Sequence, residues 1–87
     1  MAAYKLMIKA SARKELDDAS PKTLRQLLVK RIQALAENPR AQGSEKLAGH
    51  ADRYRVRQGA YRIVYRIDDA LGEVTIFKIG RRKDVYR

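Results

Sequence analysis

Residues 53–67 carry the pattern that most restricts the fold, because two runs of alternating residues flank a short turn. Alternation at every second position is typical of strands that bury one face only. In the first run Tyr54 and Val56 point away from three arginines, and the second run continues the alternation to Ile67. The stretch therefore predicts a β-hairpin with one apolar face and one arginine-rich face.

Two positions of the hairpin loop agree with this pattern. A Gln58-Gly59 loop places Arg55 opposite Arg62, whereas a Gly59-Ala60 loop places Arg57 opposite Arg62. Either arrangement sets like charges against one another across the strands, which destabilises a sheet. The hairpin itself contains no acidic residue. We therefore expect an anionic ligand to relieve the repulsion.

Two helices are predicted between the first strand and the hairpin. Ser11 is expected to cap a short helix that ends near Asp18. Ser20 is the expected N-cap of a second helix, with Pro21 as its first residue. Asn38-Pro39 ends that helix, because the residue before proline avoids helical geometry. Apolar residues at helical spacing give each helix one buried side: Ala12, Leu16 and Ala19 in the first, and Leu24, Leu27, Leu28, Ile32, Ala34 and Leu35 in the second.

The remaining strands complete a small sheet. Residues 3–9 predict a first strand, and residues 40–52 predict a loop with a possible short strand near Leu47. Residues 73–79 predict a central strand, because both of its faces are largely apolar: Val74 and Ile76 on one, and Thr75, Phe77 and Ile79 on the other. The order β-α-α-β-β-β predicts an α+β domain over residues 1–87. Its mostly antiparallel four-stranded sheet would carry a two-helix hairpin on one face.

Charge and composition narrow the choice of partner. A formal net charge of +10 in 87 residues predicts a polyanionic partner such as nucleic acid or an acidic protein. With no cysteine and one histidine, His50, neither a disulfide, a metal site nor a cofactor is expected. No apolar run approaches the roughly 20 residues of a membrane span, and no signal peptide is evident. We therefore expect a cytoplasmic protein without a membrane partner.

Four segments, in this order and spacing, resemble the RelE/ParE superfamily of toxins from toxin–antitoxin pairs: residues 46–49, 54–57, 61–65 and 79–86. The resemblance covers the whole chain, and the closing Arg-Lys-Asp-Val-Tyr pattern is more similar to the RelE branch. It implies a RelE-like fold and a ribosome-dependent endoribonuclease that cleaves messenger RNA in the A site. It also implies an acidic antitoxin, RelB-like or similar, bound in a hetero-oligomeric complex. Two alternatives stay open: a ParE-like toxin that inhibits gyrase without nuclease chemistry, and a basic RNA- or DNA-binding module.

By motif position, the resemblance implies catalytic roles for five residues: Arg55, Arg57, Arg62, Arg82 and Tyr86. RNA is cut without a metal when its 2′-hydroxyl attacks the adjacent phosphate, and arginine suits that reaction because its guanidinium can hold two phosphate oxygens. Arginine keeps its proton, so Tyr86 is the candidate general base, activated by nearby positive charge, or a group that stacks on a base. Further RNA-binding residues are expected among the remaining cations: Arg53, Arg66, Lys78, Arg81, Lys83 and Arg87.

Overall fold

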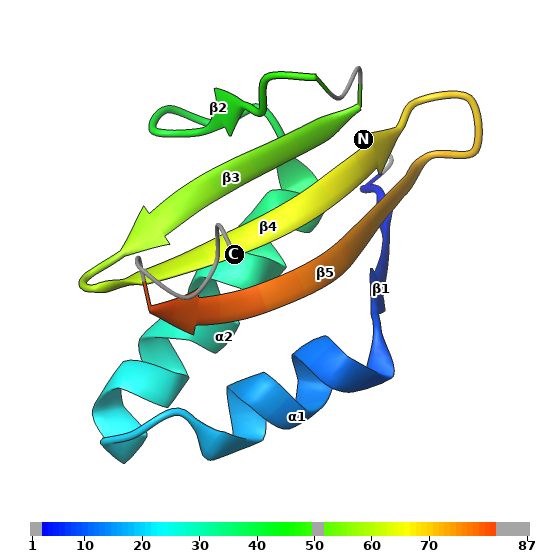
Figure 1. The fold of residues 1–87 in the computed structure, drawn as a ribbon. Helices are drawn as coiled ribbons and strands as arrows, with labels where there is room; N and C mark the ends of the chain where they lie inside the picture. The colour runs from blue at the N-terminus through cyan, green and yellow to red at the C-terminus, as the bar shows by residue number, and fades with distance from the viewer. Residues whose placement is uncertain (1–2, 50–51, 82–87) are drawn as a thin grey trace.

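Residues 3–49 and 52–81 are described by a computed structural model, and they form a five-stranded sheet with two helices. The elements follow one another as β1 (Lys5–Ile8), α1 (Ala10–Asp18), α2 (Lys22–Glu37), β2 (Glu45–Lys46), β3 (Arg53–Gln58), β4 (Tyr61–Asp68) and β5 (Glu73–Arg81). The sheet order is β1-β5-β4-β3-β2, and only the β1–β5 pair is parallel. Both helices lie on one side of the sheet (Figure 1).

This architecture confirms the predicted α+β fold with a mostly antiparallel sheet. The sheet has a fifth strand, because the short strand expected near Leu47 forms as β2, two residues long, and pairs with β3. As predicted, β5 is central and lies between β1 and β4. Neither helix is long and apolar enough to cross a membrane within the residues that the structure covers.

The β3–β4 turn settles which of the two hairpin registers forms. Gln58 pairs with Tyr61, which leaves Gly59 and Ala60 in the loop and sets Arg57 opposite Arg62. Gly59 has a φ of 61°, and no non-glycine residue of the described chain has a positive φ. A two-residue hairpin turn with glycine at its first position needs a positive φ only there. The alternative Gln58-Gly59 loop would have required a positive φ at Gln58, so the glycine position decides the register.

The core lies between the helices and the inner face of the sheet. Tyr65, Ile63, Leu28 and Ile32 are among the fully buried side chains. Ile79 is also buried, at 1% exposure, like Val74 and Ile76, although alternation placed it on the opposite face with Thr75 and Phe77. The prediction was wrong because the β4–β5 register shifts between Val64 and Tyr65, which leaves one extra residue in β5. An extra residue of this kind reverses the alternation beyond it.

The helix starts differ from the predicted caps. Lys9 precedes α1, and its N–H donates to the Ile76 carbonyl at 3.0 Å while its own carbonyl accepts the Arg13 N–H at 2.8 Å. The strand therefore ends and the helix begins at one residue, and Ser11 lies inside the helix. Pro21, not Ser20, is the N-cap of α2, so this helix begins one residue later than predicted, and neither helix has a side-chain hydrogen bond at its N-cap.

The buried side of α2 is narrower than predicted. Leu28, Ile32 and Leu35 are buried, but Leu27 is 48% exposed and Ala34 is exposed. On a helix, Leu27 and Ala34 lie roughly 100° or more away from Leu28 around the axis. The sheet is therefore contacted by a single stripe of α2, and the two outlying residues face solvent.

Polar contacts tie together the end of the sheet that lies opposite the β3–β4 turn. Arg40 donates to both carboxylate oxygens of Asp69, at 3.1 and 2.8 Å, and the Tyr4 hydroxyl donates to the same carboxylate at 2.7 Å. The Arg40 contact, helped by Tyr4, lowers the pKa of Asp69 to about 2. Nearby, the Tyr65 hydroxyl donates to the Pro39 carbonyl at 2.5 Å, and burial raises the pKa of this phenol.

Candidate functional site

Three of the predicted catalytic arginines lie on one face of the β3–β4 hairpin. The register sets Arg57 directly opposite Arg62, and Arg55 lies opposite Val64, two residue pairs further from the turn and on the same face. Directly opposed residues in an antiparallel pair have Cα atoms about 5 Å apart. The helices pack against the other face of the sheet. We call Arg55, Arg57 and Arg62 the arginine face.

The three side chains differ in their surroundings. Arg62 is buried, with 2% of its surface exposed, whereas Arg57 is exposed. The Arg55 side chain is 15% exposed, and its Nη2 lies 2.8 Å from Glu45 Oε2. A buried guanidinium is held in a fixed direction and acts in a medium of low polarity, which strengthens its effect on a nearby anion.

Acids outside the hairpin relieve part of the expected charge repulsion. Glu45 reaches Arg55 because β2 pairs Glu45 with Arg55 in register. At the far end of the hairpin, Arg66 lies 2.6 Å from Asp52 and 3.8 Å from Asp68. The repulsion that suggested an anionic ligand is therefore relieved in part by acids of the protein itself, which the sequence pattern of the hairpin did not reveal.

The predicted RNA-binding residues are spread along the sheet. Arg53 pairs with Arg66 at the far end, where the Arg53 guanidinium stacks 4.3 Å from the Phe77 ring centre. Lys78 lies 3.8 Å from Glu15 of α1. Arg81 ends β5 near the turn and is exposed. Four predicted residues lie outside the described residues: Arg82, Lys83, Tyr86 and Arg87.

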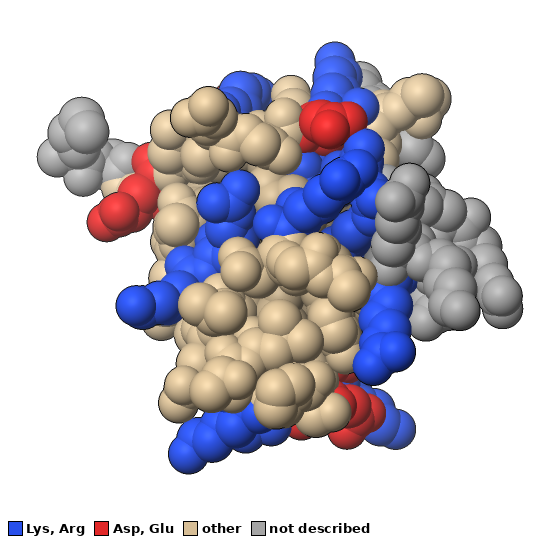
Figure 2. All heavy atoms as spheres, turned by 90° about the vertical axis from the view of Figure 1, so that its left-hand side faces the viewer, with Lys and Arg blue, Asp and Glu red and all other residues tan. Residues whose placement is uncertain are grey.

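A pocket of about 300 Å³ adjoins the arginine face at the edge of the sheet. We call it the edge pocket, and its lining residues are Arg31, Gly43, Glu45, Arg55 and Arg57. It forms where β2 pairs with only part of β3. Figure 2, which looks from the side of the β3–β4 turn, shows lysine and arginine atoms in a band across this surface of the molecule.

Sequence reasoning missed three residues of this pocket, which are Arg31, Gly43 and Glu45. One signal was present for Arg31, because it follows Leu28 by three positions and precedes Leu35 by four. That spacing places an arginine beside the buried stripe of the helix. No comparable local signal marks the other two, since the loop after α2 brings them to the site.

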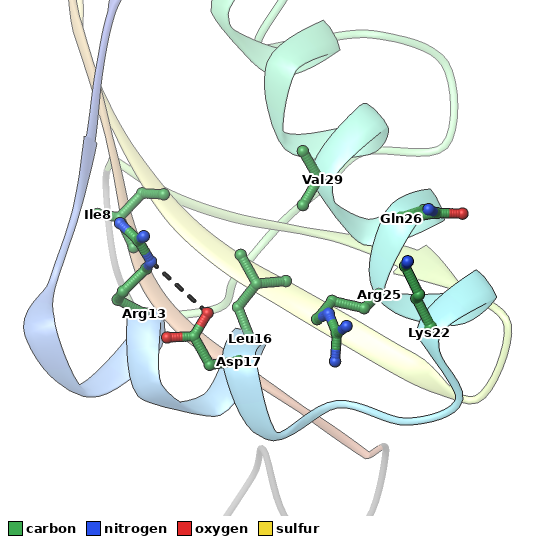
Figure 3. Close-up of a pocket in the computed structure, with 8 residues that line it drawn as sticks. All are labelled: Ile8, Arg13, Leu16, Asp17, Lys22, Arg25, Gln26 and Val29. Carbon is green, nitrogen blue, oxygen red and sulfur yellow. Dashed lines mark ion pairs between the residues drawn. The ribbon is translucent and has the colours of Figure 1, made fainter.

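A second hollow, of about 450 Å³, lies between β1, α1 and α2. Figure 3 shows that Leu16 and Val29 come from the two helices and that Ile8 comes from β1, while charged side chains surround them. One of these charged pairs is Arg13 with Asp17, at 3.7 Å. None of the predicted site residues lines this hollow.

Comparisons with known proteins agree on the class. The family model described as "ParE toxin of type II toxin-antitoxin system, parDE" matches residues 6–86. Toxin RelG of Mycobacterium tuberculosis is 30% identical over 84 residues, which cover 97% of each chain. The isolated RelE toxin of E. coli is 32% identical with a TM-score of 0.80, covering 97% of this chain and 92% of that one. RelE in the archaeal RelE–RelB complex of Pyrococcus horikoshii is 26% identical with a TM-score of 0.81, covering 94% and 97%.

These matches and the fold define a toxin of a type II toxin–antitoxin system. The chain belongs to the ParE/RelE toxin family, which confirms the resemblance seen in its motifs.

Proposed function

We propose that this toxin is a ribosome-dependent endoribonuclease that cleaves messenger RNA in the A site and so inhibits translation. The observation that carries the proposal is the β3–β4 register, which gathers Arg55, Arg57 and Arg62 on one face. These three guanidinium groups lie on the side of the sheet that the helices do not cover. They suit an RNA phosphate that gains negative charge during cleavage. The similarity to RelE and RelG toxins supports the RelE-like reading.

The reaction forms a bond from the 2′-oxygen to phosphorus and breaks the bond from phosphorus to the 5′-oxygen. The products are a 2′,3′-cyclic phosphate and a 5′-hydroxyl. Negative charge builds on the two non-bridging oxygens, where Arg62 and Arg57 would stabilise it. The proton of the 2′-hydroxyl goes to a base and another proton is delivered to the 5′-oxygen. Tyr86 remains the predicted base and Arg82 a further predicted cation, both outside the described residues.

We infer an acidic antitoxin of the RelB kind as the partner that neutralises the toxin. The net charge of +10 favours an acidic partner. Solved relatives include the RelBE2 toxin–antitoxin complex of M. tuberculosis, whose matching chain is 27% identical with a TM-score of 0.79. Such a complex should weaken as salt rises, because screening shortens the range of charge attraction. An affinity that does not change with salt would contradict a mainly electrostatic contact.

The test is a translation reaction with a defined messenger RNA, in which new 5′ ends are mapped by primer extension. The wild-type toxin should produce cuts confined to the codon in the A site. Arg62→Ala and Tyr86→Ala should strongly reduce these cuts, while Lys30→Ala, on the exposed side of α2, should not. Inhibited translation with intact messenger RNA would contradict the proposal.

Gyrase inhibition is the second candidate, because the matching family model is described by the ParE toxin. A supercoiling assay with purified gyrase separates the two readings. Inhibited supercoiling with unimpaired translation would favour the ParE-like function. Membership of a toxin family disfavours the third alternative, a basic nucleic-acid-binding module.

A further inference from the structure

We propose that the edge pocket is a second phosphate site, which binds the RNA backbone beside the phosphate that is cut. Arg31 is its principal ligand, and Glu45 is an internal competitor that holds the site closed to weak anions. The choice of RNA as the ligand rests on the proposed function. The site itself rests on the contacts of Arg31, Gly43, Glu45 and Arg55.

Arg31 reaches the pocket with donors to spare. Its Nη2 donates to the Gln42 carbonyl at 3.3 Å, which is a long hydrogen bond. Its Nε is buried and has no hydrogen-bond partner within the described residues. A buried donor without an acceptor is costly, so an anion that enters the pocket would gain a contact without displacing a protein acceptor from Nε.

Gly43 makes room for this guanidinium. A Cβ atom at position 43 would lie 3.1 Å from Arg31 Nη2, and the φ of Gly43 is +92°. A side chain at this position would therefore crowd the guanidinium and strain the backbone. The loop after α2 is thus shaped around the arginine that α2 supplies.

Glu45 occupies the place that a phosphate would take on Arg55. Its carboxylate contacts Arg55 Nη2 at 2.8 Å, and the Glu45 side chain is 62% exposed while that of Arg55 is 15% exposed. A carboxylate and a phosphate both offer two oxygens to a guanidinium. Because the Glu45 carboxylate itself is exposed, water can solvate it once it leaves Arg55, so an RNA phosphate can take its place.

Charge and position connect the pocket to the proposed reaction. Three arginines and one glutamate line the pocket, which leaves a positive excess that attracts an anion. Arg55 and Arg57 belong both to the pocket and to the arginine face. One RNA strand can therefore set one phosphate on the arginine face and its neighbour in the pocket.

The first experiment measures binding without cleavage. A fluorescein-labelled RNA with all 2′-hydroxyls methylated cannot be cut by 2′-hydroxyl attack, and its anisotropy reports binding to the full-length toxin across a range of salt. Arg31→Gln should weaken binding several-fold at low salt. It should also reduce the slope of log K against log salt by about 0.7, the value for one lost contact on a single strand. Glu45→Gln should tighten binding.

Lys30→Gln is the matched control, since it removes one positive charge from the adjacent, exposed position of α2. It should leave the slope closer to wild type than Arg31→Gln does. Equal behaviour of the two variants would overturn the phosphate site, as would weaker binding by Glu45→Gln. If Arg31→Gln fails to fold, Arg31→Lys can replace it, since this variant keeps the charge. Its affinity for the RNA should lie between that of wild type and that of a toxin without the pocket contact. Glu45→Gln tests the site independently.

The second experiment separates this site from the proposed function. In ribosomal cleavage assays, Arg31→Gln should raise KM and leave kcat nearly unchanged, because it contacts a phosphate that does not react. If the wild type cleaves RNA and Arg31→Gln has an unchanged KM, the phosphate site in the edge pocket is overturned and the proposed function remains. An inactive wild type that still shows the expected order of RNA affinities supports the pocket and overturns the nuclease.

Discussion

The two ends of the β3–β4 hairpin use arginine in different ways. At the end away from the turn, Arg66 contacts Asp52 and Asp68, and Arg40 contacts Asp69 with two hydrogen bonds. At the turn end, Arg57 faces Arg62 across the strands, and Arg55 on the same face is bound to Glu45. The far end joins elements that are distant in sequence, whereas the turn end gathers positive charge on one face.

Exposure decides how much each end matters energetically. The side chains of Arg40 and Arg66 are 46% and 47% exposed, so solvent screens their ion pairs and each contributes little. Arg62 is 2% exposed, so its charge acts in a less polar medium. The number of ion pairs is therefore a poor guide to function, and the buried arginine at the turn is the better one.

The largest expected effect compares Arg62→Ala with Arg66→Ala. Removal of one donor to a charge that develops in the transition state typically costs about 10²- to 10³-fold in rate, which we expect for Arg62→Ala. Arg66→Ala should lower the rate less than about tenfold, since its guanidinium is already held by two carboxylates. Single-turnover cleavage on programmed ribosomes measures both, with circular dichroism as the check on folding. Equal losses would break the distinction between the two ends.

Tyr65→Phe should lower stability and leave cleavage unchanged, which is the reverse of the effect expected for Arg62→Ala. It removes the hydroxyl that donates to the Pro39 carbonyl at 2.5 Å in a fully buried position. The loss should lower the free energy of unfolding by about 1–2 kcal/mol, as measured by urea denaturation, and leave cleavage unchanged. Tyr61→Phe, partly buried at the turn, is the control and should unfold like wild type. A cleavage defect in folded Tyr65→Phe would mean that the far end takes part in function.

Local patterns were enough to predict the strands of the hairpin, the helices and the shared face of the arginines. Alternation and helical spacing are properties of neighbouring residues, and β3, β4 and α2 form close to where these patterns place them. The extra residue in β5 was not predictable in this way, because a bulge interrupts the period without changing composition. Ile79 was therefore assigned to the wrong face.

The edge pocket depends on contacts between distant parts of the chain. Glu45 meets Arg55 only because the two-residue β2 pairs with β3, and a strand that short leaves almost no pattern. Arg31 enters the pocket through the rotation of α2 and the space at Gly43. The roles of Arg82 and Tyr86 stay predictions, since both residues lie outside the described part of the chain.

Acid should weaken the far end through Asp69. Its pKa is lowered from 3.8 to about 2 in the folded protein by the hydrogen bonds from Arg40 and Tyr4. A lowered pKa contributes stability that is complete above the unfolded value and is lost as the pH falls from about 4 towards about 2. Asp69→Asn should therefore be less stable than wild type at neutral pH, and the difference should shrink at low pH. Urea midpoints across this range test it, and a constant difference would exclude the linkage.

The smallest expected effect has opposite signs at the two ends. Arg57→Gln removes a like charge directly opposite Arg62, so the free energy of unfolding should rise by roughly 0.3 kcal/mol at low salt. Arg66→Gln removes a charge that faces two carboxylates, so it should lower stability slightly. Added salt should erase both differences, because it screens repulsion and attraction alike. Thermal melts at low and high salt measure the signs. A loss of stability in Arg57→Gln would show that the turn-end charges are already neutralised within the protein, and the reason to expect an anionic ligand there would disappear.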